Sequence, residues 1–189
     1  DVLEGGKPQG RIIILSGPGN NGGDGLAMAR LLAANGIESD IHLVRAGKSL
    51  TSDTQSNLEF LYRSGIRVQE SDSESLQAVL AGLASDDWIV DALLGTGISG
   101  TLRSPFCEIV GAINQSAAQV MSVDVPSGLD ADTGEACGMA VRANVTVTFV
   151  ATKAGFRFEH ALPYLGRIEV RQIGVPLKWL SSWYETHRQ

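Results

Sequence analysis

Short apolar runs alternate along the chain with longer segments whose apolar residues recur every three or four positions. A β-branched run between glycines is typical of a strand that is covered on both faces, whereas the wider spacing indicates a helix. The short runs predict strands at 11–16, 41–44, 66–68, 88–91, 120–123, 145–150 and 166–175. The spaced segments predict helices at 25–35, 53–64, 74–84 and 105–116.

Residues at the ends of two predicted helices support their boundaries. Gly36 follows the helix at 25–35, and glycine is favoured just after a helix. Ser104 is a good N-cap for the last helix, and Pro105 is tolerated at a first helical position. The regular alternation, with no proline-rich linker, predicts one doubly wound α/β domain over 1–189. In such domains, ligands bind beyond the carboxyl ends of the strands.

Composition narrows the class of protein. A chain of 189 residues buries about 70% of its unfolded surface, so it needs no disulfide or metal to fold. The net charge of −6 counts against a nucleic-acid partner, and no apolar run is long enough to cross a bilayer. Two cysteines, Cys107 and Cys137, indicate a reducing compartment, and we expect a cytoplasmic location. Because the chain begins at Asp1 and not at a methionine, we expect further residues upstream, and a targeting peptide for an organelle could be among them.

The glycine-rich segment 17–25, Gly-Pro-Gly-Asn-Asn-Gly-Gly-Asp-Gly, directly follows the first predicted strand. Glycines let a backbone approach a ligand closely, and the start of a helix offers free N–H groups to an anion. The segment fits the glycine spacing of dinucleotide-binding folds. However, Val44-Arg45 at the end of the second strand offers no acidic residue for a ribose. Gly47-Lys48-Ser49 resembles the end of a P-loop, but His42 occupies the position of its first glycine.

Polar residues also follow two other predicted strands. Asp91 and Asp124 each come directly after an apolar run, so both are expected at the carboxyl edge of the sheet. Oxygens of Asn21, Asp91 and Ser127 can converge there on a cation. Hard cations prefer oxygen ligands, and the chain has no Cys/His spacing typical of zinc. The sequence therefore predicts a polar site shared by three strand ends.

These loops together resemble the NAD(P)H-hydrate epimerase family, also called the YjeF N-terminal domain. The resemblance rests on the glycine segment 17–25, on Asp-Ala-Leu-Leu-Gly-Thr-Gly at 91–97 and on Ser-Val-Asp-Val-Pro-Ser-Gly-Leu-Asp at 122–130. Lys-Ala-Gly at 153–155 is a weaker fourth element. The resemblance covers about 11–176, and the combination of motifs is very specific.

The resemblance implies a Rossmann-like three-layer α/β/α sandwich with a mostly parallel sheet, a homodimer and a bound potassium ion. It implies that Asn21, Asp91 and Ser127 hold the potassium. The implied substrate is hydrated NADH or NADPH. The residues that the resemblance places against it are Asn20, Asn21, Gly22, Gly23, Asp24, Gly95, Thr96, Gly97, Ile98, Ser99, Gly100, Thr101 and Asp124.

This chain departs from the family pattern at two places. Ser16-Gly17 stands where members usually have Cys-Gly. Family members also carry one or two helices before the first strand, whereas only about ten residues precede it here. We therefore expect this chain to lack those upstream N-terminal helices.

The implied reaction interconverts the R and S forms of the hydrated cofactor at C6, a carbon that carries a ring nitrogen and a hydroxyl. Inversion requires the hydroxyl to leave and return, or the ring to open and close, and either route needs an acid and a base. Asp124 is our candidate for this role. A nearby cation favours its ionised form and burial disfavours it, so the sequence leaves its protonation open.

Two roles for Lys153 and two alternative functions remain open at this stage. Lys153 either offsets a phosphate charge or packs at the surface. The same pocket could serve a non-catalytic module that binds a nucleotide or a protein, although the presence of Asn21, Asp91 and Asp124 together weighs against this. A nucleotide-dependent transferase or redox enzyme is disfavoured by the missing acidic residue and the missing P-loop glycine.

Overall fold

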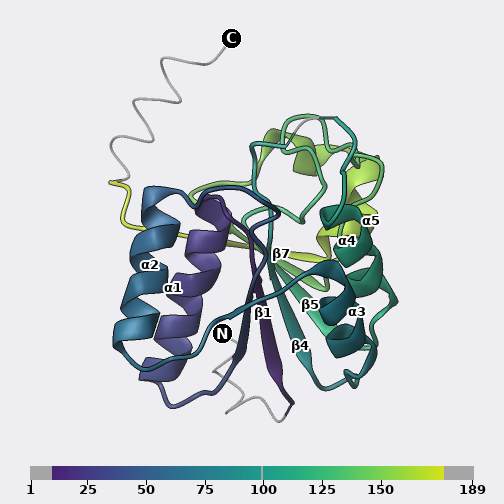
Figure 1. Cartoon of the computed structure of the whole chain (residues 1–189). Helices are drawn as coiled ribbons and strands as arrows, with labels where there is room; N and C mark the ends of the chain where they lie inside the picture. The colour runs from purple at the N-terminus through teal and green to yellow at the C-terminus, as the bar shows by residue number, and fades with distance from the viewer. Residues whose placement is uncertain (1–9, 99, 177–189) are drawn as a thin grey trace.

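Seven parallel strands form one sheet in the computed structural model, which describes residues 10–98 and 100–176 (Figure 1). The spatial order is β3-β2-β1-β4-β5-β6-β7, so the direction of chain progress reverses between β1 and β4. Such a switch point is where doubly wound sheets bind ligands. The strands are β1 Ile12–Ser16, β2 Asp40–Leu43, β3 Gln69–Glu70, β4 Trp88–Ala92, β5 Gln119–Val123, β6 Val145–Phe149 and β7 Arg167–Arg171.

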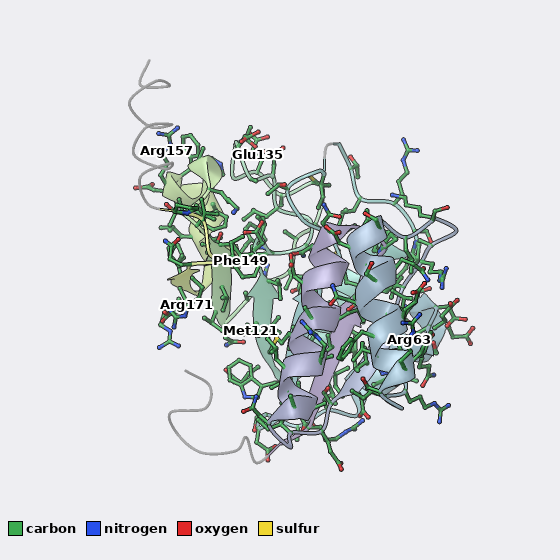
Figure 2. The ribbon with its side chains drawn as sticks, turned by 90° about the vertical axis from the view of Figure 1, so that its left-hand side faces the viewer. Arg63, Met121, Glu135, Phe149, Arg157 and Arg171 are labelled. Carbon is green, nitrogen blue, oxygen red and sulfur yellow. The ribbon has the colours of Figure 1, made fainter. Side chains whose placement is uncertain are left out.

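Helices cover both faces of the sheet and make it the middle of three layers. The helices α1, Asn20–Ala34, and α2, Ser52–Arg63, lie on one face, and α3, Ser73–Ala81, and α4, Phe106–Gln115, lie on the other (Figure 1). Figure 2 shows α1 and α2 side by side. After β6 come two 3₁₀ turns, η1 Ala154–Arg157 and η2 Glu159–Ala161, and a short helix α5 Leu162–Leu165.

The burial of β1 explains why its sequence is apolar throughout. Successive side chains of a strand point to opposite faces of the sheet. Ile12 and Ile14 accordingly join the core under α1 and α2, whereas Ile13 and Leu15 join the core under α3 and α4. The predicted Rossmann-like three-layer fold is confirmed, and the sheet is parallel throughout its described strands.

Several predicted ends of strands and helices differ from those in the structure. The strand expected at 66–68 is the two-residue β3 at 69–70, whose exposed residues carry no hydrophobic pattern. The helix expected from Pro105 begins at Phe106 with Pro105 as its N-cap, so Ser104 does not cap it. The helix expected from Gly25 begins at Asn20. The final strand is shorter than 166–175, and the turns after β6 were not predicted.

Candidate functional site

The early start of α1 depends on close backbone packing by its glycines. A Cβ atom at Gly22 would lie 1.9 Å from the carbonyl oxygen of Gly17. A Cβ at Gly17 would lie 1.7 Å from the carbonyl oxygen of Leu93, which follows β4. Glycine disfavours helices by about 1 kcal/mol relative to alanine, which is why the sequence predicted a loop here. Here the need for close approach outweighs that propensity and brings the first turn of α1 against the end of β4.

Asn21 lies in this first turn and is 7% exposed. Its side-chain Nδ2 donates a hydrogen bond of 2.9 Å to the carbonyl oxygen of Leu94. Its Oδ1 is buried and has no hydrogen-bond partner in the part of the chain that the structure describes. A buried acceptor left unpaired costs about 1–3 kcal/mol. Oδ1 of Asn21 is therefore an atom suited to a cation or to a donor group of a ligand.

Asp91 lies on β4 and is fully buried beneath this turn. Its Oδ2 accepts hydrogen bonds of 2.8 Å from the Ser122 hydroxyl and from the backbone N–H of Ser127. The Ser127 hydroxyl donates to Oδ1 at 2.5 Å. Burial raises the pKa of Asp91, and these hydrogen bonds oppose that rise.

The three residues expected to hold a cation meet around Leu94. The backbone N–H of Leu94 donates to the Ser127 hydroxyl oxygen at 2.9 Å, and its carbonyl accepts from Asn21. Ser127 in turn contacts Asp91, so Asn21, Ser127 and Asp91 form one connected network. The loops that follow β1, β4 and β5 each contribute to it, as parallel topology predicts.

Asp124 follows β5 with a backbone φ of 64°, in the left-handed region, and its side chain is 19% exposed. Non-glycine residues rarely adopt this conformation, and such positions are found disproportionately at functional sites. Its Oδ1 lies 2.6 Å from Nζ of Lys153. The same oxygen accepts hydrogen bonds of 3.2 Å from the Thr148 hydroxyl and from the backbone N–H of Phe149. The end of β6 and the loop after it thus fix the carboxylate.

A cavity of about 500 Å³ lies above this network, at the carboxyl ends of β1 and β4. This volume is typical of small-molecule sites. Asp91 and Ser127 are buried below it and do not line it. The residues that line it are Pro18, Gly19, Asn20, Asn21, Asp24, Lys48, Ser49, Thr51, Leu93, Leu94, Gly95, Thr96, Gly97, Ile98 and Asp124.

The cavity brings together most, but not all, of the predicted substrate residues. Gly22 and Gly23 are buried in α1 behind its wall. Gly100 and Thr101 do not line it, and Ser99 lies outside the described residues. The cavity is also lined by Lys48, Ser49 and Thr51, which were not among the predicted substrate residues. The sequence feature that could have identified them is Gly47-Lys48-Ser49 after β2, which resembles the end of a P-loop.

Asp24 is a second carboxyl group in this cavity. Its pKa is raised to about 6, first by partial burial of the carboxyl group and then by the negative charges of Asp124 and Asp53. Asp24 and Asp124 line the same cavity but differ in their charged neighbours: among the described residues, Asp124 is the carboxylate that pairs with Lys153.

Asp24→Asn is expected to raise the melting temperature at about pH 7.5 and to change it little near pH 4. The folded protein binds the proton of Asp24 more tightly than the unfolded chain does, because the folded-state pKa is about 6 instead of 3.8. Stability is therefore lost as the pH rises between these two values, and asparagine avoids that loss. Calorimetry at both pH values tests this. An equal effect of Asp24→Asn at both would contradict it, and Asp132→Asn, at an exposed position, is the control.

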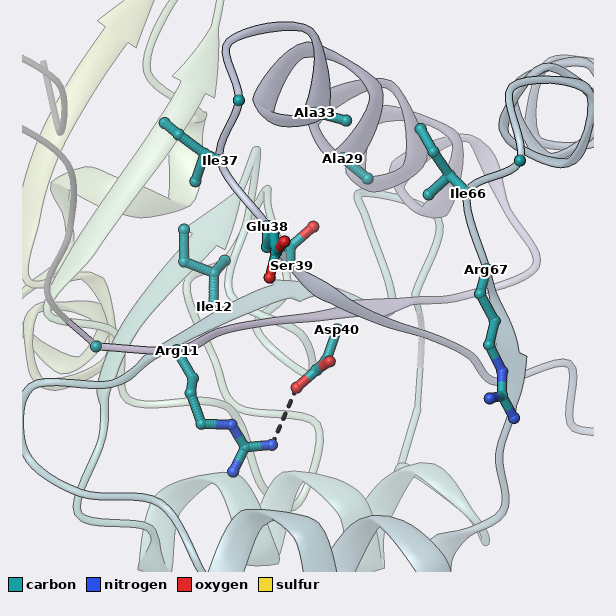
Figure 3. Close-up of a pocket in the computed structure, with 13 residues that line it drawn as sticks. Arg11, Ile12, Ala29, Ala33, Ile37, Glu38, Ser39, Asp40, Ile66 and Arg67 are labelled. Atoms are coloured by element: carbon teal, nitrogen blue, oxygen red, sulfur yellow. Dashed lines mark hydrogen bonds and ion pairs between the residues drawn. The ribbon is translucent and has the colours of Figure 1, made fainter.

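A larger cavity of about 870 Å³ lies at the opposite edge of the sheet (Figure 3). Arg11, just before β1, and Asp40, the first residue of β2, form an ion pair of 3.0 Å at its rim. The side chains of Ile37 and Ile66 give the cavity an apolar lining. Amino ends of parallel strands are not where such folds bind ligands. Its rim ion pair is more than half exposed, so it adds little to stability. The smaller cavity is the candidate functional site.

Comparison with known proteins places the chain in a family. The model of the YjeF-related protein N-terminus matches residues 4–155. An NAD(P)H-hydrate epimerase of Pirellula staleyi is 39% identical over 170 residues, which cover 89% of this chain and 75% of that protein. A bifunctional NAD(P)H-hydrate repair enzyme Nnr of Thermofilum pendens is 40% identical, and the match covers 86% of this chain but 31% of that enzyme.

A solved structure agrees with the fold. The crystal structure of the yeast protein ynu0 superposes with a TM-score of 0.67 at 27% identity, covering 78% of this chain and 61% of that one. None of the helices that the structure describes is both long and apolar enough to span a membrane. Because the family model matches most of this chain, the chain belongs to the YjeF-related protein N-terminus family.

Proposed function

We propose that this chain is a metabolite-repair isomerase that interconverts the R and S epimers of hydrated NADH and NADPH at C6. The names of the relatives support the substrate and the reaction. The observation that carries the proposal is the placement of Asp124 and Asp24 in one cavity at the carboxyl ends of the strands. The predicted homodimer and cytoplasmic location stay predictions.

The carboxylates supply the acid–base chemistry that inversion at C6 requires. Where the hydroxyl leaves and re-adds, Asp124, held at the end of β5, gives a proton to the C6 hydroxyl so that it departs as water, and takes a proton back from the water that adds to the other face. Where the ring opens instead, Asp124 accepts the proton of the C6 hydroxyl as the bond from C6 to the ring nitrogen breaks, the complementary acid protonates that nitrogen, and closure reverses both transfers. Asp24, with a pKa of about 6, exchanges protons readily near neutral pH and suits the complementary role. Gly95, Thr96, Gly97 and Ile98 line the same cavity.

A direct assay tests this function. The pure R epimer of hydrated NADH is incubated with and without protein in potassium buffer, and chromatography follows the R/S ratio. We expect the protein to bring the mixture to equilibrium much faster than the spontaneous reaction. A folded sample that gives only the spontaneous rate would overturn the proposal and favour a binding module.

We propose further that potassium binds at the network around Leu94. The unpaired Oδ1 of Asn21 fits this ion, because potassium is bound in proteins by carbonyl-type oxygens. Asn21, Ser127 and Asp91 would hold it. Among the described residues, no group of three or more His, Cys, Asp or Glu side chains is placed to hold a metal. When bound, the ion supplies positive charge at the floor of the cavity.

Potassium chloride is expected to raise the melting temperature more than choline chloride at equal concentration, because a ligand that binds only the folded state stabilises it. Asn21→Ala removes the unpaired oxygen and should abolish the difference between the two salts. Asn20→Ala, at the exposed neighbouring position, is the matched control and should preserve it. Equal melting temperatures of the wild-type protein in both salts would contradict the proposed ion. Calorimetry measures all three proteins.

A further inference from the structure

Lys153 makes a short, largely buried ion pair with Asp124. Its Nζ lies 2.6 Å from Oδ1 of Asp124, and the two side chains are 20% and 19% exposed. Nζ also lies 3.4 Å from the carbonyl oxygen of Phe149 at the end of β6. Lys153 directly precedes η1, so two neighbouring strand ends, those of β5 and β6, are joined by this contact.

All the polar contacts that Asp124 makes with described side chains and N–H groups use one of its two carboxylate oxygens. Lys153, the Thr148 hydroxyl and the backbone N–H of Phe149 all reach Oδ1. Three donors on one oxygen fix the rotation of the carboxyl group. Oδ2 is thereby left for a group that enters the cavity, which Asp124 lines.

Stability alone explains this lysine poorly. A buried ion pair gains little net stability, because desolvation of both charges offsets their attraction. Thr148 and Phe149 already give Oδ1 two hydrogen bonds without a charge. Ordering a lysine side chain also costs rotamer entropy. The lysine does, however, provide a positive charge next to one of two carboxyl groups, Asp124 and Asp24, that share a cavity.

We propose that Lys153 is a positioning residue for the epimerisation, whose ammonium group holds Oδ1 of Asp124 so that Oδ2 faces C6 of the substrate. This inference rests on the proposed function. It replaces the two earlier interpretations of Lys153, because its ammonium group contacts a carboxylate and it does not line the cavity where a phosphate would bind. A misplacement of about 1 Å at a reacting group can cost about 10²-fold in rate.

Lys153→Met tests the inference, because methionine keeps an unbranched apolar stem and removes the charge. We expect kcat to fall by up to about 10²-fold while KM for the R epimer of hydrated NADH changes little. Lys153→Arg, which keeps a positive charge, should recover part of kcat. Arg157→Met is the matched control: Arg157 is exposed on η1 and stacks on Phe158, and its loss should leave kcat unchanged.

Other results of these measurements would overturn either the positioning role of Lys153 or the proposed function. An unchanged kcat in Lys153→Met, or a raised KM at constant kcat, overturns the positioning role while the wild-type rate still supports the proposed function. A wild-type protein without epimerase activity overturns the proposed function, and the inference falls with it. Should Lys153→Met fail to fold, Lys153→Gln removes the charge and keeps a polar side chain at the same position. A lower kcat at constant KM then supports the inference, and an unchanged kcat overturns it.

Discussion

Asp124→Asn is expected to lower kcat for epimerisation of hydrated NADH by about 10²–10⁴-fold, the range typical of a lost general acid–base catalyst. The substitution is nearly isosteric. The amide oxygen of asparagine can still accept from Thr148 and Phe149, which now bond to Oδ1. The amide nitrogen then occupies the place of Oδ2, where it can donate but cannot take up a proton. Binding is thus retained while proton transfer is lost.

The measurement compares kcat and KM of the purified variant with the wild-type protein, together with their melting temperatures. Asp132→Asn makes the same chemical change at an exposed position outside the cavity and should match the wild-type rate. If Asp124→Asn retains a rate within about twofold of the wild type, Asp124 has no part in proton transfer. A loss confined to KM would instead place Asp124 in substrate binding alone.

Gly22→Ala is expected to destabilise the protein by about 3 kcal/mol or more, at or beyond the upper end of the usual cost of overpacking. The new Cβ would lie 1.9 Å from the carbonyl oxygen of Gly17 and within 3 Å of two further backbone atoms of that residue. Backbone atoms cannot rotate away as a flexible side chain can. The first turn of α1 must therefore shift, which also moves Asn21 away from Leu94.

Gly19→Ala is the matched control for Gly22→Ala. A Cβ at Gly19 would meet nothing within 4 Å, and its backbone φ of −88° is open to any residue. Alanine is a poorer N-cap than glycine, so we expect a loss of at most about 1 kcal/mol. Denaturant unfolding of both variants measures the two free energies. Equal stabilities of Gly22→Ala and Gly19→Ala would show that the turn can relax at little cost.

The sequence was a good guide where burial on both faces of the sheet forces an apolar run. The strand Ile12–Ser16 was predicted to within a residue for this reason, and Val145–Phe149, where valine alternates with threonine, was predicted as closely. It was a poor guide to the start of α1. Helix propensity reflects a residue and its neighbours in the sequence. Gly22 and Gly25 must be glycine for another reason, because a Cβ atom there would clash with Gly17 and with Ala92. Such contacts exist only after folding.

In the candidate site, too, some features could be predicted from the sequence and others could not. The family motifs identified Asn21, Asp91 and Ser127, and parallel topology predicted that their loops meet. The pairing of Asp124 with Lys153 was beyond the sequence, because it depends on where the loop after β6 turns. The raised pKa of Asp24 depends on burial and on charges from other segments, so it too required the folded arrangement.

The parallel topology also has a consequence for how the protein folds. The contact between Asn21 and Leu94 joins positions 73 apart, that between Ser127 and Asp91 positions 36 apart, and that between Asp124 and Phe149 positions 25 apart. Non-local contacts of this kind form only after the chain has lost the entropy of closing long loops, so such domains fold slowly. The cavity forms only when distant segments have docked. A growing chain on the ribosome therefore has no complete cavity until β6 and the loop after it have emerged, and the apolar faces of its incomplete sheet stay exposed during that interval.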